Sequence, residues 1–134
     1  MIVTDTNVIG YLFLSSSKSQ LSERALRKDP EWAAPLLWRS ELRNVLASYM
    51  RKAILALHEA QQIMERALTL MRGREFEVSS AEILKLVSSS KCSAYDCEFI
   101  AVARDLRVPV VTVDKQLLRE FPDFTISLDA YCKQ

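Results

Sequence analysis

The sequence has few of the residues that mark several common classes of protein. Histidine occurs only as His58, and the three cysteines, Cys92, Cys97 and Cys132, lack the paired spacing of zinc ligands. These counts exclude a histidine-rich zinc or haem site, and the odd cysteine number fits a reducing cytoplasm better than a disulfide framework. Only two glycines and four prolines occur in 134 residues, so long disordered linkers are not expected.

Several motifs and segments are absent as well. There is no glycine-rich phosphate loop, no G-x-S-x-G and no Cys-x-x-Cys, which excludes the usual kinds of NAD and ATP binding. The run Ile9 to Leu14 is too short to span a bilayer, and Asp5 interrupts the start of the chain, so neither a membrane segment nor a signal peptide is expected. The net charge of +1 provides no overall basic field, so nucleic acid would need a local patch.

What is present is an alternation of short apolar runs with helical periodicity. At 49% hydrophobic and 26% charged residues, the 134 residues suit one globular domain, 1–134. The alternation predicts an α/β fold with a mostly parallel sheet covered by helices on both faces. The predicted strands are residues 2–4, 31–34, 75–78, 108–113 and 124–128, the predicted helices are 8–14, 19–28, 36–51, 56–72, 80–89, 94–106 and 115–120, and a short tail ends the chain.

Two aspartates follow the clearest predicted strands. A β-branched run leads from Ile2 into Asp5, and the run from Val108 ends in the same way at Asp114. In open α/β sheets, ligands bind beyond the carboxyl ends of the strands, so both carboxylates are candidates for a site. Each also has a simpler interpretation, because aspartate is a favoured N-cap and a helix is predicted after each one.

Two further acids lie near the starts of predicted helices. Glu41 borders the apolar stripe of helix 36–51, and Asp96 lies inside the apolar stripe that includes Tyr95 and Phe99. Ionised carboxylates are seldom buried without a partner, so both positions are informative. Asp96 also has a structural alternative, since Ser93-x-x-Asp96 has the spacing of a capping box.

All four acids are predicted at one edge of the sheet, and a shared acidic site explains them together better than four separate caps. Carboxylates crowd together only if a pKa rises or a cation binds. With no suitable histidine or cysteine nearby, the cation should be hard and oxygen-seeking, such as Mg²⁺ or Mn²⁺. The matching chemistry is phosphodiester hydrolysis, in which such an ion lowers the pKa of an attacking water and stabilises charge on the phosphate.

The motifs around these acids resemble those of PIN-domain proteins. In order they are Val3-Thr4-Asp5-Thr6-Asn7, Ser40-Glu41-Leu42-x-Asn44, Ser93-Ala94-Tyr95-Asp96 with Phe99-Ile100-Ala101-x-Ala103, and Thr112-Val113-Asp114. The chain length and the order of the motifs resemble the VapC-type toxins of prokaryotic toxin–antitoxin pairs. One departure is Cys97, where a small residue is usual, and it faces away from Asp96 on a helical wheel.

The resemblance implies a three-layer α/β/α fold and a Mg²⁺- or Mn²⁺-dependent endoribonuclease. It implies a catalytic and metal-binding set of four acids, supported by hydroxyl or amide contacts from four further residues. The four acids are Asp5, Glu41, Asp96 and Asp114. The four supporting residues are Thr6, Asn7, Ser93 and Thr112. It also implies RNA as substrate, a small antitoxin protein that covers the site, and a homodimer, for which the helices from Leu36 and Ala56 offer surplus apolar faces.

Two alternatives remain at the level of sequence. One is a PIN-like module that binds RNA or protein without cutting, although such a module has no need of four crowded carboxylates. The other is a phosphatase-type hydrolase with Asp5 as nucleophile. That chemistry usually brings a second aspartate two residues on, where this chain has Asn7.

Overall fold

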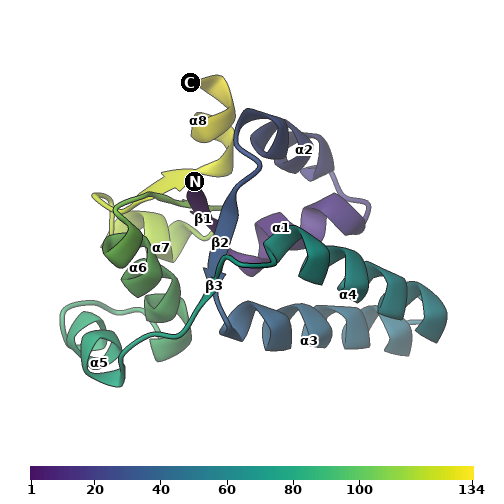
Figure 1. The fold of residues 1–134 in the computed structure, drawn as a ribbon, viewed down its shortest axis with the longest axis horizontal. Coiled ribbons are helices and arrows are strands. Elements are labelled where there is room, and N and C mark those ends of the chain that lie inside the picture. The colour runs from purple at the N-terminus through teal and green to yellow at the C-terminus, as the bar shows by residue number, and fades with distance from the viewer.

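The computed structural model describes all residues, 1–134, and shows a five-stranded sheet with helices on both sides (Figure 1). Every neighbouring pair of strands is parallel, and the strand order is β3-β2-β1-β4-β5. The predicted α/β class with a mostly parallel, five-stranded sheet is confirmed. The strands are β1 (Ile2–Thr4), β2 (Trp32–Pro35), β3 (Glu75–Phe76), β4 (Val110–Thr112) and β5 (Thr125–Ser127).

Eight helices form the outer layers. In Figure 1, α1 to α4 lie on one side of the sheet and α5 to α7 on the other, while α8 packs against α2 and β5. The predicted three-layer α/β/α arrangement is therefore confirmed. The helices are α1 (Thr6–Phe13), α2 (Ser19–Lys28), α3 (Leu37–Arg51), α4 (Leu57–Met71), α5 (Ser80–Ser88), α6 (Ala94–Leu106), α7 (Lys115–Glu120) and α8 (Leu128–Lys133).

The two central strands, β1 and β4, are buried along their whole length. Val3 pairs with Val110 and Thr4 pairs with Val111, and none of these four residues exposes any surface. β-Branched residues suit this position because both faces of the sheet are covered. Helix α6 packs across β1, β2 and β4 and contributes much of the core. The carboxyl ends of β1 and β4 are consequently held side by side.

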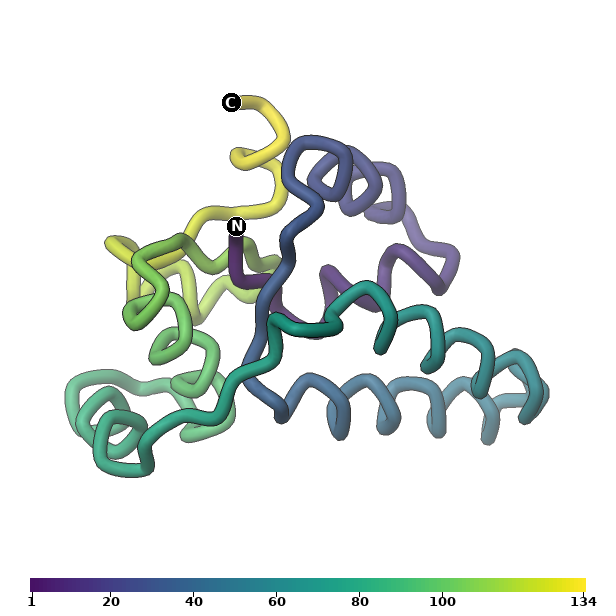
Figure 2. Tube along the Cα trace, viewed as in Figure 1, coloured from purple at the N-terminus to yellow at the C-terminus, as the bar shows by residue number.

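Helices α3 and α4 run next to each other and project from the sheet, joined at the far end by a short turn (Figure 2). A cluster of polar contacts ties the base of this hairpin to the edge strand β3. The Glu75 carboxylate accepts hydrogen bonds from Arg39 Nε and Nη2, each at 2.6 Å, and from Trp38 Nε1 at 2.7 Å. This bidentate pair holds the first turn of α3 against β3, although β3 itself is only two residues long.

Two details differ from the sequence prediction. The predicted tail after β5 is helix α8, whose first turn is capped by Ser127 Oγ accepting from the Ala130 N–H at 3.1 Å. Tyr95 does not join the apolar face of α6, because its residue surface is 63% exposed, whereas Cys97 is fully buried. Helix α6 packs against α5 as well as against the sheet, so its buried surface is wider than a single stripe and includes Cys97, while Tyr95 in the first turn stays exposed. None of the helices combines the length and apolarity needed to cross a bilayer.

Candidate active site

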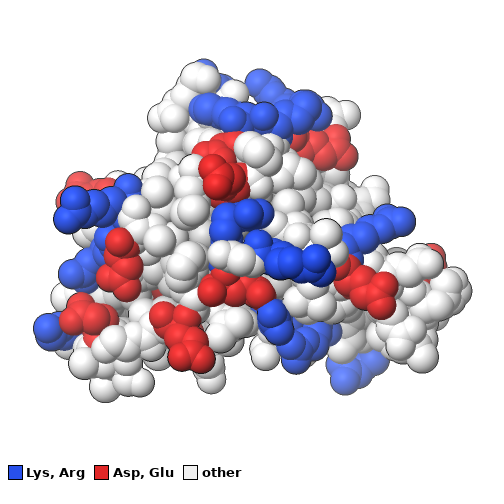
Figure 3. Space-filling model, in the orientation of Figure 1, with Lys and Arg blue, Asp and Glu red and all other residues white.

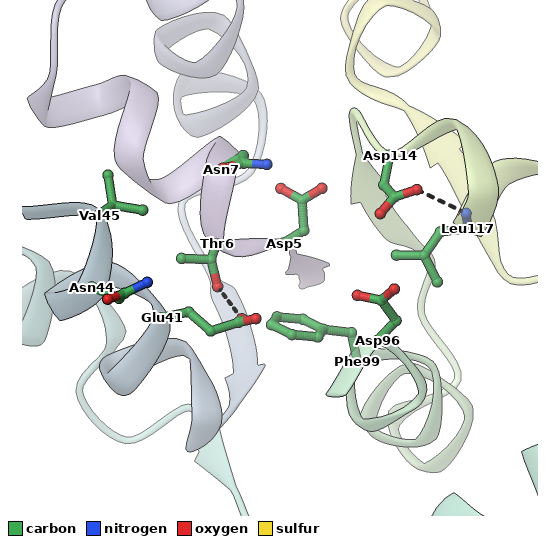
Figure 4. Close-up of a pocket in the computed structure, with 10 residues that line it drawn as sticks. All are labelled: Asp5, Thr6, Asn7, Glu41, Asn44, Val45, Asp96, Phe99, Asp114 and Leu117. Atoms are coloured by element: carbon green, nitrogen blue, oxygen red, sulfur yellow. Dashed lines mark hydrogen bonds between the residues drawn. The ribbon is translucent and has the colours of Figure 1, made fainter. Parts of the chain in front are cut away.

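The four predicted acids meet at the carboxyl edge of the sheet. Asp5 directly follows β1 and Asp114 lies two residues after β4, while Glu41 is on α3, which follows β2, and Asp96 is in the first turn of α6. All four line one cavity of about 260 Å³, here called the acidic cavity (Figure 4). Residues up to 109 positions apart in the chain are thus brought together because parallel strands end at the same edge. The cavity is completed by Thr6, Asn7, Asn44, Val45, Phe99 and Leu117.

Asp5 is the most deeply held of the acids, with only 7% of its surface exposed. Its Oδ1 accepts from the Val8 N–H at 2.9 Å, and its Oδ2 accepts from the Thr112 hydroxyl and from the Val113 N–H at 3.1 Å. Burial raises the pKa of Asp5, these hydrogen bonds lower it, and the charge of Asp114 adds to the rise. Asp5 is therefore an N-cap of α1 and a wall of the cavity at once, so the two interpretations of this residue do not exclude each other.

Asp114 is fixed in a similar way at the start of α7. Its Oδ1 accepts from the backbone N–H groups of Gln116 at 2.8 Å and Leu117 at 3.1 Å. The Thr112 hydroxyl, which donates to Asp5, accepts from the Asp114 N–H at 2.9 Å. One buried threonine therefore connects the two aspartates and sets their relative position.

Glu41 occupies the opposite wall, on α3. The Thr6 hydroxyl donates to its Oε1 at 2.7 Å, which ties α3 to the first residue of α1. Burial raises the pKa of Glu41, the Thr6 hydrogen bond lowers it, and the negative charges of Asp96, Asp5 and Glu98 raise it further. Glu41 lines the same cavity as Asp5 and Asp96, so their negative charges act on its carboxylate.

Asp96 is held by its backbone rather than by its carboxylate. Ser93 is the N-cap of α6, and its Oγ accepts from the Asp96 N–H at 3.1 Å. Burial raises the pKa of Asp96, and the charge of Asp114 raises it further. Ser93 thus performs the capping that the sequence allows for this pair, and the Asp96 carboxylate faces the acidic cavity.

The four predicted supporting residues lie in different relations to the acids. Thr6 and Thr112 each donate to a carboxylate, and Ser93 caps the helix that carries Asp96. Asn7 lines the cavity, but no hydrogen bond joins its side chain to another residue there (Figure 4). Asn44, which also lines the cavity, was not among the predicted site residues. Its position three residues after Glu41 places it on the same face of the helix, and that spacing was the available signal.

The donor set of the cavity suits a hard cation. Its lining contains four carboxylates and two side-chain amides, and it contains no lysine, arginine or histidine. The ion pairs of the protein lie elsewhere, between Met1 and Asp29, Arg39 and Glu75, and Lys85 and Glu82. No three of the His, Cys, Asp and Glu side chains are close enough to hold a metal ion together. The support for a cation is the oxygen-rich lining itself, since Mg²⁺ prefers oxygen ligands, keeps several waters and takes only one or two carboxylates directly.

Surface charge outside the cavity is mixed. On the face shown in Figure 3, lysine and arginine are interspersed with aspartate and glutamate, and neither sign dominates. The net charge of +1 agrees with this pattern. The acids of the cavity are therefore a local concentration of negative charge and not part of a generally acidic surface.

By its fold and site this is an α/β protein with an open parallel sheet and an acidic cavity at the carboxyl edge of that sheet. Comparison with known proteins identifies its family. The profile of the PIN domain matches residues 2–122, and the chain belongs to the PIN domain family. The chain is similar to Ribonuclease VapC3 of Pyrobaculum aerophilum, with 27% identity over 125 residues that cover 90% of this chain and 95% of that protein.

Solved structures share the fold at lower sequence identity. A crystal structure of a protein from Pyrobaculum aerophilum has a TM-score of 0.77 and 17% identity, covering 98% of this chain and 93% of that one. A toxin–antitoxin complex from Klebsiella pneumoniae has a TM-score of 0.72 and 19% identity, covering 96% of this chain and 98% of that one. These likenesses extend over nearly the whole length of each chain and show the PIN fold.

Proposed function

We propose that this protein is a metal-dependent endoribonuclease, the toxin of a type II toxin–antitoxin pair, and that residues 1–134 form one PIN-like domain. The observation that carries the proposal is the acidic cavity, where four carboxylates from four chain segments face one space without a basic partner. Membership of the PIN domain family and the similarity to a protein named as a VapC ribonuclease support the same function.

In this proposal Mg²⁺ or Mn²⁺ is held by Asp5, Glu41, Asp96 and Asp114, directly or through water. When bound, the ion supplies charge stabilisation at the phosphate and a lowered pKa for the attacking water. The chain itself positions the carboxylates. Thr112 and the backbone N–H groups orient Asp5, and Thr6 orients Glu41. Since burial raises the pKa values of Asp5, Glu41 and Asp96, binding a cation offsets a cost that the empty cavity would carry.

The proposed partners are RNA, a cognate antitoxin protein and a second copy of the chain. The toxin–antitoxin assembly of the Klebsiella pneumoniae neighbour supports an antitoxin. Exposed apolar side chains gather on and near the α3–α4 hairpin, where Met50, Ile54 and Leu57 are 37%, 60% and 60% exposed. Such surfaces are typical of interfaces. Light scattering at high micromolar concentration should report a dimer, and a monomer under these conditions would contradict the homodimer.

The alternatives from the sequence are less well supported. A module that binds without cutting does not explain why the Asp5, Glu41 and Asp96 carboxylates are partly or wholly buried against one another's charge. A hydrolase with Asp5 as nucleophile usually has a second aspartate two residues on, and this chain has Asn7 at that position.

The test is cleavage of single-stranded RNA with Mg²⁺ or Mn²⁺ and with excess EDTA, using the Asp96→Ala variant. Cleavage should require the metal and should fall by several orders of magnitude in the variant. Asp105→Ala is the matched control, because Asp105 is an exposed aspartate on the same helix and lies outside the cavity lining. Undiminished cleavage in EDTA, or equal activity of Asp96→Ala and Asp105→Ala, would contradict the proposal.

A further inference from the structure

A second, smaller cavity adjoins the acidic cavity between α1 and α3. It has a volume of about 80 Å³, and we call it the tyrosine pocket because Tyr11 of α1 and Tyr49 of α3 both line it. Thr6, Asn7 and Val45 line both cavities, so the two are direct neighbours. The tyrosine pocket is completed by Gly10, Leu14 and Ser16.

We propose that the tyrosine pocket binds one nucleobase of the RNA, next to the phosphodiester that is cut. The inference rests on the proposed ribonuclease function and extends it, because it assigns the position of a neighbouring nucleotide and names the residues that recognise it. The shared lining residues place the two cavities within the reach of adjacent groups on one RNA strand.

The chemistry of the lining selects a base over a phosphate. No side chain of the tyrosine pocket carries a charge, so nothing there neutralises an anion. The adjoining acidic cavity would further repel a phosphate that brings no metal ion with it. A nucleobase is uncharged, planar and aromatic, and aromatic side chains stack on bases in many single-strand binding sites. The Asn7 amide and the Ser16 hydroxyl supply hydrogen-bonding groups at the rim.

Tyr11 of α1 and Tyr49 of α3 both line the pocket. Both rings are half-buried, so their orientation is restricted while part of each surface stays open to the pocket. Each phenol also supplies an O–H that can donate a hydrogen bond to a base.

The experiment pairs a change in the RNA with a change in the protein. A cut is first located in a mixed-sequence single-stranded RNA with wild-type protein and Mn²⁺. Short oligonucleotides around that cut then carry an abasic ribose at one position at a time. Loss of the stacked base should slow cleavage by about 5- to 150-fold at one position flanking the cut, and much less elsewhere.

The protein arm uses Tyr11→Leu and Tyr49→Leu, with Tyr11→Phe to restore the ring. Each leucine variant should cut the intact oligonucleotide more slowly, and the abasic substitution at the sensitive position should cost it little further. Tyr11→Phe should recover most of the rate on the intact oligonucleotide. Tyr95→Leu is the control, because this tyrosine adjoins Asp96 in sequence but is 63% exposed and lines neither cavity. It should keep the wild-type response to the abasic series.

The outcomes separate this inference from the ribonuclease itself. If wild-type protein cuts the RNA but no flanking abasic position matters, the tyrosine pocket does not bind a base and the ribonuclease stands. The same holds if the leucine variants keep the full abasic effect, because their losses would then be structural. If Tyr95→Leu weakens the abasic effect as much as Tyr11→Leu does, the base lies elsewhere. If wild-type protein cuts no RNA with either metal, both proposals are refuted.

Discussion

Replacement of Thr112 by valine tests whether one hydroxyl organises the acidic cavity. Thr112 exposes no surface, donates to Asp5 Oδ2 and accepts from the Asp114 N–H at 2.9 Å. Thr112→Val keeps the shape of the side chain and removes both bonds. A hydrogen bond to a charged group contributes about 1.5–3 kcal/mol and a neutral one about 1 kcal/mol, so the variant should lose about 2–4 kcal/mol of stability.

A matched control lies on the neighbouring strand. Thr4 is also fully buried, and its Oγ1 has no hydrogen-bond partner. Thr4→Val removes a hydroxyl whose burial already costs free energy, so this variant should gain about 1 kcal/mol. The opposite signs exclude a general effect of placing valine at the end of a central strand, since the two residues lie on the paired strands β1 and β4.

The loss in Thr112→Val should also depend on pH. The Thr112 hydrogen bond lowers the pKa of Asp5 against a larger rise caused by burial. Removing it raises the folded-state pKa of Asp5 further above the unfolded value. A raised carboxyl pKa costs stability as the pH climbs from the unfolded to the folded pKa, so the variant's deficit should grow with pH and diminish in acid.

The assay is urea unfolding in EDTA at several pH values, with thermal melts as a second measure. At roughly 4 °C per kcal/mol for a chain of this size, Thr112→Val should melt about 8–16 °C lower than wild type. Equal changes in Thr112→Val and Thr4→Val, or a Thr112→Val deficit that is constant with pH, would refute the idea that Thr112 acts through Asp5.

Three further predictions concern separate parts of the protein. In EDTA, Asp96→Ala should melt at or above the wild-type temperature, because the pKa of Asp96 is raised by burial and by Asp114. The stabilisation of this variant by Mn²⁺ should be smaller than that of wild type, which is about 2.7 kcal/mol at a Mn²⁺ concentration of 100 times Kd. A lower melting temperature in EDTA together with a wild-type response to Mn²⁺ would show that Asp96 has only a structural role. Glu75→Gln should cost about 1–3 kcal/mol in urea unfolding at pH 7. Arg39 holds the pKa of Glu75 below its usual value. The stability that Glu75 contributes is therefore present above its unfolded-state pKa and should be lost as the pH falls through its folded-state pKa. A cost of Glu75→Gln that is the same in acid as at pH 7 would contradict this prediction. Gly10→Ala should raise stability by about 0.5–1 kcal/mol, since an added Cβ meets only Leu42 Cδ1 at 3.9 Å. Gly73→Ala should lower stability, because φ is +80° at this glycine. Thermal melts in which Gly73→Ala is the more stable variant would contradict this prediction.

The sequence alone determined the class of the fold and the identity of the acids that meet. β-Branched runs ending in Thr and Asp predicted the two central strands, and their parallel order follows from the helices between them. Asp5 and Asp114 could be expected side by side because residues that follow neighbouring parallel strands share an edge. The PIN motifs carried the same information, and the family match over residues 2–122 agrees with them.

The tertiary structure decided how each acid is held and what surrounds it. The bond from Thr112 to Asp5 joins residues 107 positions apart, and no local pattern specifies it. A helical wheel placed Tyr95 in a single buried stripe, whereas the packing of α6 against the sheet and α5 buries Cys97 and leaves Tyr95 exposed. The tyrosine pocket likewise depends on the packing of α1 against α3, which brings Tyr11 and Tyr49 together. Side-chain periodicity reports the environment of one element, while a site built from several elements depends on how they pack.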